Sequence, residues 1–201
     1  YLVADTAKFL IAYPQGLTVK DVVFNDVGAG WNVPETYSAE HDDVMFISQI
    51  IDDLDADPDY AVDLSRVYAT GWSNGGEMSF YLACALSDKI AAVAGIAAQM
   101  NKPLLDNVCM PGRKISVLHM LGTEDLFFPV EENDTYPAFA GTADYWAANA
   151  NCSAEPIITN FEDADPTDMS TVTLSTYSDC DDEFEVLSYR IESGGHAWPG
   201  G

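Results

Sequence analysis

Apolar and polar residues recur along the chain in two periods, and these periods predict helices and strands in turn. From Asp42 to Leu54, apolar residues return every three or four positions with aspartates on the other side, which is the pattern of an amphipathic helix. Further helices are predicted at 74–86 and around Asp144–Ala150, and residues 1–8 read as the end of another. Apolar runs and alternating segments predict strands at 9–13, 66–72, 90–98, 115–121, 171–178 and 184–192.

This order of elements predicts a single α/β domain over residues 1–201. Strand followed by helix, repeatedly, implies a mostly parallel sheet with helices on both faces. The longest apolar run, from Ile90 to Met100, is about half of what a bilayer requires, so no membrane-spanning segment is predicted.

The charge of the chain is strongly acidic and narrows its partners. Eight Lys and Arg residues against 33 Asp and Glu residues give a net charge of −25. A field of this sign repels nucleic acids and anionic lipids, so neither is expected as a partner. Carboxylates spread along the whole chain favour a surface adapted to salt, where ions screen the repulsion. An acidic secreted enzyme without that adaptation is an equally good interpretation.

The acidic stretch at 53–59 resembles the start of a calcium-binding loop, because aspartates occupy every second position from Asp53 to Asp59. The sixth position of such a loop requires Gly and here holds Pro58, and the twelfth requires Glu and here holds Leu64. The stretch is better interpreted as a solvated helix end and loop. Neither a metal site nor a cofactor is predicted.

The four cysteines, Cys84, Cys109, Cys152 and Cys180, lie outside any CxxC motif and have no neighbouring His. This arrangement disfavours zinc and favours two disulfides in an exported protein. We expect each cysteine to pair with its neighbour, because the first two bracket one predicted strand and the last two share the loop-rich final quarter. Buried free thiols are the alternative.

Ser73 lies in the pattern Gly71-x-Ser73-x-Gly75, where a predicted strand ends and a predicted helix begins. A sharp turn at this point needs glycines where side chains would collide. It lifts the serine hydroxyl to the helix N-terminus, where free N–H groups favour a developing anion. Ser73 is therefore a candidate nucleophile. A serine that only caps the helix is the alternative, but a cap does not require glycine on both sides.

A serine hydroxyl needs a base that accepts its proton. His196 is the candidate, because it lies in the glycine-rich segment SGGHAWPGG just after the last predicted strand. His119 lies inside an apolar strand and is expected in the core. His41 opens an acidic helix and is expected to be exposed.

The base in turn needs a carboxylate that orients it. Asp125 follows the strand at 115–121 and is expected at the same edge of the sheet, with Glu124 as its rival. The order Ser73, Asp125, His196 is the order found in α/β-hydrolases, and it differs from the two common peptidase orders.

The segments GWSNGGEMSFYLAC, HMLGTEDLFFPV and GGHAWPGG, with FLIAYPQG and DDVMFISQIIDDL, resemble the secreted bacterial esterases grouped as polyhydroxybutyrate depolymerases and feruloyl esterases. The resemblance extends over nearly the whole chain. It implies a secreted serine carboxylic-ester hydrolase with Ser73 as nucleophile, His196 as general base and acid, and Asp125 as its partner. It also implies a Cys84–Cys109 disulfide. Leu121 departs from the family, which often has His before Gly-Thr.

A hydrolase of this kind would act through an acyl-enzyme on Ser73, with the backbone N–H of Asn74 as one oxyanion donor. Hydroxycinnamoyl esters of plant polysaccharide and 3-hydroxyalkanoate polyesters both suit such a site, and no residue decides between them. A non-catalytic α/β-hydrolase-like module that binds polymer or sugar is the alternative function. Candidate substrate-binding aromatics are Trp72, Trp31, Trp198 and Phe127.

The second oxyanion donor of an α/β-hydrolase comes from a loop after an earlier strand. The segment VGAGW at 27–31 is the candidate within the chain, but it comes at the wrong point in the order. We therefore expect these 201 residues to be an interior portion of a longer product, truncated at both ends, whose upstream part supplies that donor.

Overall fold

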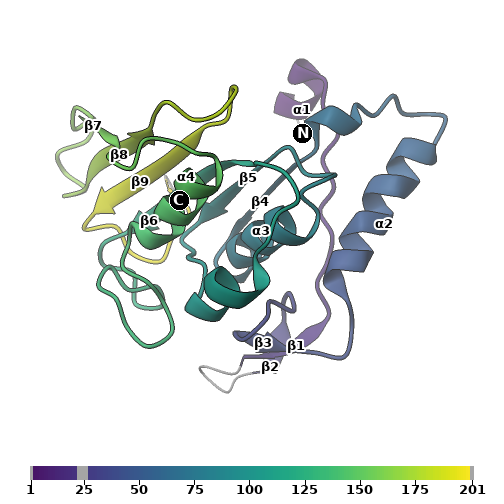
Figure 1. Cartoon of the computed structure of the whole chain (residues 1–201), viewed down its shortest axis with the longest axis horizontal. Helices are drawn as coiled ribbons and strands as arrows, with labels where there is room; N and C mark the ends of the chain where they lie inside the picture. Colours follow the sequence, from purple (N-terminus) through teal and green to yellow (C-terminus); the bar gives the residue numbers. More distant parts are fainter. Residues whose placement is uncertain (1, 22–26, 200–201) are drawn as a thin grey trace.

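The fold is built on a six-stranded sheet of strand order β4-β5-β6-β9-β8-β7 (Figure 1). The structure is a computed structural model and describes residues 2–21 and 27–199. The strands are β4 (Tyr68–Trp72), β5 (Ala92–Ile96), β6 (Ser116–Gly122), β7 (Ile157–Asn160), β8 (Thr171–Tyr177) and β9 (Val186–Glu192). The helices are α1 (Leu2–Ala7), α2 (Asp43–Ala56), α3 (Asn74–Ala85) and α4 (Gly141–Asn149), with a 3₁₀ turn at Leu64–Arg66 and a π turn at Leu104–Val108.

Four of the six strands are parallel, so the predicted α/β sheet is confirmed. Gly71, Gly95, His119 and Ser188 lie side by side across β4, β5, β6 and β9. β8 is antiparallel to β9, and β7 is antiparallel to β8. β7 was not predicted, because all four of its residues are exposed and it therefore lacks an alternating burial pattern.

Helices α3 and α4 cover the same face of the sheet. Phe80 of α3 lies over Gly95, where an added Cβ would be 2.3 Å from the Phe80 ring. Phe139, just before α4, contacts His119 with 5.1 Å between ring centroids. Because Gly95 and His119 are neighbours in register, both helices pack on this side, and the hydrophobic core lies beneath them.

The opposite face of the sheet is open to solvent along β4. Tyr68 and Trp72 point to that face from β4 and are 65% and 46% exposed. The predicted amphipathic helix α2 packs on the α3 side instead, since Lys89, just after α3, forms an ion pair with Asp52 of α2 (Figure 1). None of the described helices is long and apolar enough to cross a membrane.

The predicted strand at 9–13 is also wrong. These residues have no strand partner within the described ranges, and Phe9, Leu10 and Ile11 are 49%, 51% and 43% exposed. A strand depends on ladder hydrogen bonds with a neighbour, which an apolar run does not itself provide. The chain continues into a small antiparallel sheet that the sequence did not predict, composed of β1 (Thr18–Asp21), β2 (Val27–Ala29) and β3 (Tyr37–Ser38).

Both predicted disulfides are confirmed. Cys84 of α3 is bonded to Cys109, and Cys152 is bonded to Cys180, so no cysteine is free. The first bond ties the C-terminal part of α3 to the segment that precedes β6. The second ties the segment after α4 to the segment after β8.

We expect the Cys84→Ala/Cys109→Ala double variant to be less stable than the wild type by about 2 to 5 kcal/mol, because the bond closes a loop in the unfolded chain. Alanine avoids placing a new hydroxyl in this buried position. Urea denaturation under non-reducing conditions measures the difference. Reductant should then destabilise the double variant less than the wild type, and equal sensitivity of the two proteins would contradict this role.

Candidate active site

Ser73 lies on a strained turn between β4 and α3. Its backbone has φ 56° and ψ −126°, a conformation that residues other than glycine rarely adopt. The Ser73 N–H donates to the carbonyl of Ile96 at 2.9 Å, which ties the turn to the end of β5. A Cβ on Gly71 would lie 2.3 Å from the backbone of Gly75, so the close packing of the turn requires glycine at position 71, whereas a Cβ on Gly75 would come no closer than 3.9 Å to Trp31.

The three residues predicted to act together are in hydrogen-bond contact. His196 Nε2 lies 2.9 Å from Ser73 Oγ, and His196 Nδ1 lies 2.8 Å from Asp125 Oδ2. A carboxylate can only accept, so Nδ1 carries the proton in this contact, and neutral Nε2 is left to accept the Ser73 hydroxyl proton. The arrangement can therefore move a proton from the serine to the imidazole.

The Asp125 carboxylate is held in place by backbone hydrogen bonds that do not involve His196. Its side chain is fully buried, and its Oδ1 accepts hydrogen bonds from the backbone N–H groups of Phe127 at 2.8 Å and Phe128 at 3.0 Å. The other oxygen is thereby directed at His196. Glu124 is exposed, so the structure favours Asp125 over this rival for contact with the imidazole.

The loop that carries His196 follows β9 and is held against the loop after β6. The Glu124 N–H donates to the Gly194 carbonyl at 2.8 Å, and the Ser193 N–H donates to the Thr123 hydroxyl at 2.9 Å. The backbones approach so closely that a Cβ on Gly122 would lie 2.1 Å from the Gly194 carbonyl oxygen. This close approach brings the histidine loop next to Asp125.

Three aromatic rings surround the His196 imidazole. The ring centroids of Phe127, Trp72 and Phe128 lie 4.6, 4.7 and 5.8 Å from that of His196. Trp72 and Phe127 are about half exposed, whereas Phe128 is buried. Trp198 is 52% exposed and makes no ring contact with His196 in the described part of the chain. Its role in substrate binding stays a prediction.

Asn74 is the first residue of α3, so its backbone N–H has no carbonyl partner within the helix. Its position next to Ser73 is compatible with the predicted oxyanion donor, and that role stays a prediction. The Asn74 side chain has a role that the sequence did not reveal. Its Oδ1 accepts from the Trp31 N–H at 2.6 Å, and its Nδ2 donates to the Trp31 carbonyl at 3.1 Å. These two bonds hold the segment around Trp31 against the turn.

The segment 27–31 is a poor source for the second oxyanion donor. The Gly30 N–H already donates to the Leu17 carbonyl at 2.9 Å, and the Trp31 N–H donates to Asn74. Residues Val27–Ala29 form β2 and pair with β1. The segment therefore contributes to the site by packing against the turn.

Glu77, one helical turn after Ser73, is a buried acid that sequence reasoning missed. It is 1% exposed, and its Oε1 accepts a hydrogen bond from the Tyr136 hydroxyl at 3.1 Å. Burial raises the pKa of Glu77 to about 8, and the negative charge of Asp21 adds to this rise, although the hydrogen bond from Tyr136 opposes it. Glu77 is therefore largely protonated at neutral pH. In the sequence, Glu77 is marked by no more than its place as an acidic residue among the apolar positions of the predicted helix.

The other two histidines do not join these groups. His119 is fully buried on β6, as predicted, and its Nδ1 lies 3.0 Å from the Ser188 hydroxyl. Burial lowers the pKa of His119 to about 4, so it is neutral at physiological pH. His41 is half-buried before α2, where exposure was expected, and its Nε2 lies 3.5 Å from Asp43.

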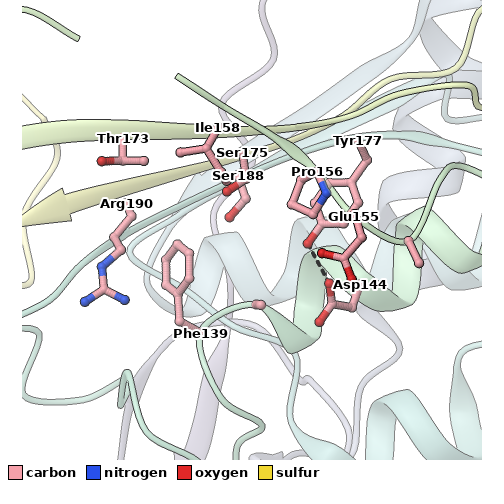
Figure 2. Close-up of a pocket in the computed structure, with 12 residues that line it drawn as sticks. Phe139, Asp144, Glu155, Pro156, Ile158, Thr173, Ser175, Tyr177, Ser188 and Arg190 are labelled. Carbon is pink, nitrogen blue, oxygen red and sulfur yellow. Dashed lines mark hydrogen bonds between the residues drawn. The ribbon is translucent and has the colours of Figure 1, made fainter. Parts of the chain in front are cut away.

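A cavity of about 460 Å³ lies elsewhere, between α4 and the β7–β9 end of the sheet (Figure 2). Ser73, Asp125 and His196 are not among its lining residues. Its buried Tyr177 hydroxyl already donates to Asp144 at 2.5 Å. The described residues contain no cluster of three or more His, Cys, Asp or Glu side chains that could hold a metal ion.

Nearly the whole chain is similar in sequence to curated esterases. It is 30% identical to feruloyl esterase B of Piromyces equi, over 96% of the chain and 36% of that protein. It is 29% identical to the esterase NocK of Nocardia uniformis subsp. tsuyamanensis, over 98% of the chain and 59% of that protein. The solved structure of an acetyl xylan esterase from Aspergillus awamori matches with a TM-score of 0.54 and 15% identity, over 78% of this chain and 62% of that one. No protein-family model matches the chain.

These comparisons confirm the relationship to esterases that the motifs predicted, and the solved structure confirms the fold. The chain spans 36% and 59% of the lengths of the two curated relatives. The depolymerase part of the predicted resemblance stays a prediction.

The buried acid Glu77 should make stability depend on pH. Its pKa is raised from 4.5 to about 8 on folding, so the folded state holds a proton that the unfolded state releases. Its contribution is complete below pH 4.5 and is lost as the pH rises toward 8, at roughly 1.4 kcal/mol per pH unit. Glu77→Gln cannot ionise, so we expect this variant to gain stability relative to the wild type between pH 5 and 8.

Urea denaturation of both proteins at several pH values in this window measures the effect. Glu131→Gln removes an exposed carboxylate and is the control for the change in net charge. A constant difference between Glu77→Gln and the wild type across the window would show that Glu77 titrates normally.

Proposed function

We propose that this chain, a relative of curated esterases with an α/β-hydrolase fold, is a serine carboxylic-ester hydrolase. The observation that carries the proposal is the hydrogen-bonded series Asp125, His196 and Ser73 on a strained turn. A helix cap would explain the serine alone, but Ser73 makes no side-chain capping bond in α3. Binding of a polymer would require neither of the two hydrogen bonds.

The first half of the reaction forms an acyl-enzyme. Ser73 Oγ attacks the carbonyl carbon of the ester while His196 Nε2 accepts the hydroxyl proton. The imidazolium that forms is stabilised by the Asp125 carboxylate through Nδ1. The negative charge on the carbonyl oxygen is stabilised by the Asn74 N–H at the start of α3. The imidazolium then gives its proton to the alcohol, which leaves.

The second half repeats these steps with water. His196 Nε2 accepts a proton from the water, the hydroxide attacks the acyl carbon, and Ser73 recovers its proton as the acid leaves. The same three side chains therefore serve both halves, and no cofactor is needed in this mechanism.

The proposed substrates are esters of plant polysaccharide or of polyhydroxyalkanoate. The relative named feruloyl esterase B supports a hydroxycinnamoyl ester. The half-exposed rings of Trp72 and Phe127 beside His196 can contact an aromatic acyl group of such a substrate. Two disulfides support secretion, because such bonds persist in oxidising compartments.

The function is tested by hydrolysis of p-nitrophenyl acetate and butyrate. A second panel of methyl ferulate, acetylated xylan and hydroxybutyrate oligomers then identifies the class of ester. If no ester is hydrolysed above the buffer rate, the alternative of a polymer-binding module gains support, and binding to the same polymers should be measured.

We expect Ser73→Ala to abolish turnover and to leave the fold intact, because the lost oxygen is the atom that bonds to the acyl group. Steady-state kinetics with p-nitrophenyl butyrate, together with circular dichroism, tests both parts. The nucleophile assignment would be untenable if the folded variant kept activity close to that of the wild type.

Asp125→Asn should lower kcat by about 10⁴, since an amide at this position stabilises the wrong tautomer of His196. Glu124→Gln is the matched control, because it makes the same chemical change in the adjacent exposed residue and should have a mild effect. The reverse ranking of the two variants would transfer the orienting role to Glu124.

A further inference from the structure

The His196 imidazole has few anchors other than its two hydrogen bonds. It lies two residues after Gly194 and directly after Gly195, in a loop whose next residue, Ala197, donates its N–H to the Gly195 carbonyl. A Cβ on Gly195 would meet nothing within 4 Å, so no side chain packs at this position, although the Gly195 carbonyl itself lies close to Gly122. A glycine at this point also permits many backbone conformations. Besides its two hydrogen bonds and the backbone contacts of Ser193 and Gly194, the direction of the imidazole is limited by what packs against the ring.

The rings of Trp72 and Phe127 provide that packing from two separate elements, together with the more distant, buried ring of Phe128. Trp72 is the last residue of β4 and directly precedes Ser73, whereas Phe127 lies two residues after Asp125. Their centroids are 4.7 and 4.6 Å from the imidazole centroid, and both are tilted, by 44° and 52°. These values fall in the range of favourable aromatic contacts. Each ring is thus attached to the segment that carries one hydrogen-bond partner of His196.

We propose that Trp72 and Phe127 are positioning residues for His196, which keep its imidazole aligned between Ser73 and Asp125. This proposal rests on the proposed hydrolase function. The faces of aromatic rings also attract cations, so the two rings stabilise the imidazolium that forms when Ser73 gives up its proton. The sequence suggested that both residues line a substrate cleft. Their contact with His196 gives them a second role that affects kcat rather than KM.

Phe127 has a further link to the same geometry through its backbone. Its N–H donates to Asp125 Oδ1 at 2.8 Å, while its ring contacts the imidazole to which the other oxygen of Asp125 is bonded. Phe127 therefore contacts both the Asp125 carboxylate, through its backbone, and the His196 imidazole, through its ring. A substitution of the Phe127 side chain removes only the ring contact and keeps the backbone bond.

The test uses the Trp72→Leu/Phe127→Leu double variant, in which apolar side chains remain but the rings are lost. Misalignment of a reacting group by about 1 Å can lower the rate about 10²-fold, so we expect kcat to fall by about this factor with little change in KM. The substrate is p-nitrophenyl acetate, whose acyl group is too small to need an aromatic cleft. Trp72→Phe and Phe127→Tyr keep a ring and should retain most of the activity.

Phe161→Leu is the matched control. Phe161 is 47% exposed, close to the 46% of Trp72 and the 49% of Phe127, and it stacks on Tyr189 rather than on His196. Its replacement should leave kcat unchanged. A rise in KM with unchanged kcat in the double variant would assign the two rings to substrate binding and overturn the proposal.

The double variant is also made in a His196→Ala background. If the rings act through the imidazole, they have nothing left to position, so the residual activity should not fall further. A further 10²-fold loss in this background would show that the rings act independently of His196 and would likewise overturn the proposal.

A spectroscopic measurement separates this proposal from the proposed function. Ring contacts at these distances shift the proton NMR signals of the His196 imidazole, and these shifts should decrease in the double variant and persist in Trp72→Phe. Unchanged signals would refute the positioning role even in an active esterase. If the wild-type chain shows the shifts and the double variant loses them, but the wild type hydrolyses no ester, the positioning geometry stands and the hydrolase function alone is refuted.

Discussion

The candidate site depends on the parallel register of β4, β5, β6 and β9. Parallel strands end at one edge of a sheet, so the residues that follow β4, β6 and β9 meet there although they are far apart in the chain. Ser73 and His196 are 123 positions apart, and Asp125 and His196 are 71 apart. The strand ladders hold these three segments at hydrogen-bond distance, and the loops need only cover short gaps.

Close backbone contacts next to the strand ends fix the positions of the loops that carry these residues. At Gly71 and Gly75 the turn closes on itself, and at Gly122 and Gly194 the loops after β6 and β9 touch. A Cβ on Gly71 would distort the turn that carries Ser73, and a Cβ on Gly122 would push apart the loops that carry Asp125 and His196. This is why glycines surround the site, and why the motif Gly71-x-Ser73-x-Gly75 could be recognised from the sequence.

Much of the fold was predictable where burial follows a period. The strands β4, β5, β6 and β9 and the helices α2 and α4 have buried and exposed positions that repeat along the sequence, and β8 begins with alternating polar and apolar residues. The segment 9–13 has an apolar run but no partner within the described residues, and a single segment carries no information about its partner. The three short strands of the small sheet are too brief to show any period.

The candidate site was predictable to the same extent and for related reasons. Ser73, Asp125 and His196 each follow a predicted strand, so topology alone indicated that they meet. The bonds of the Asn74 side chain and the contact between Glu77 and Tyr136 were not predictable, because their partners come from loops 43 and 59 positions away. No local pattern connects such segments.

The buried acid bears on how an acidic chain can stabilise an oxyanion. The N-terminus of α3 provides a partial positive charge next to Ser73, and a charged carboxylate one turn along the same helix would oppose it. Burial keeps Glu77 largely protonated at neutral pH, so this acid adds little negative charge beside the start of α3, although the chain carries 33 acidic residues against eight basic ones. Desolvation of Glu77 thus has two effects. It lowers the stability of the fold at high pH, and at neutral pH it keeps a negative charge away from the helix N-terminus that would stabilise the proposed oxyanion.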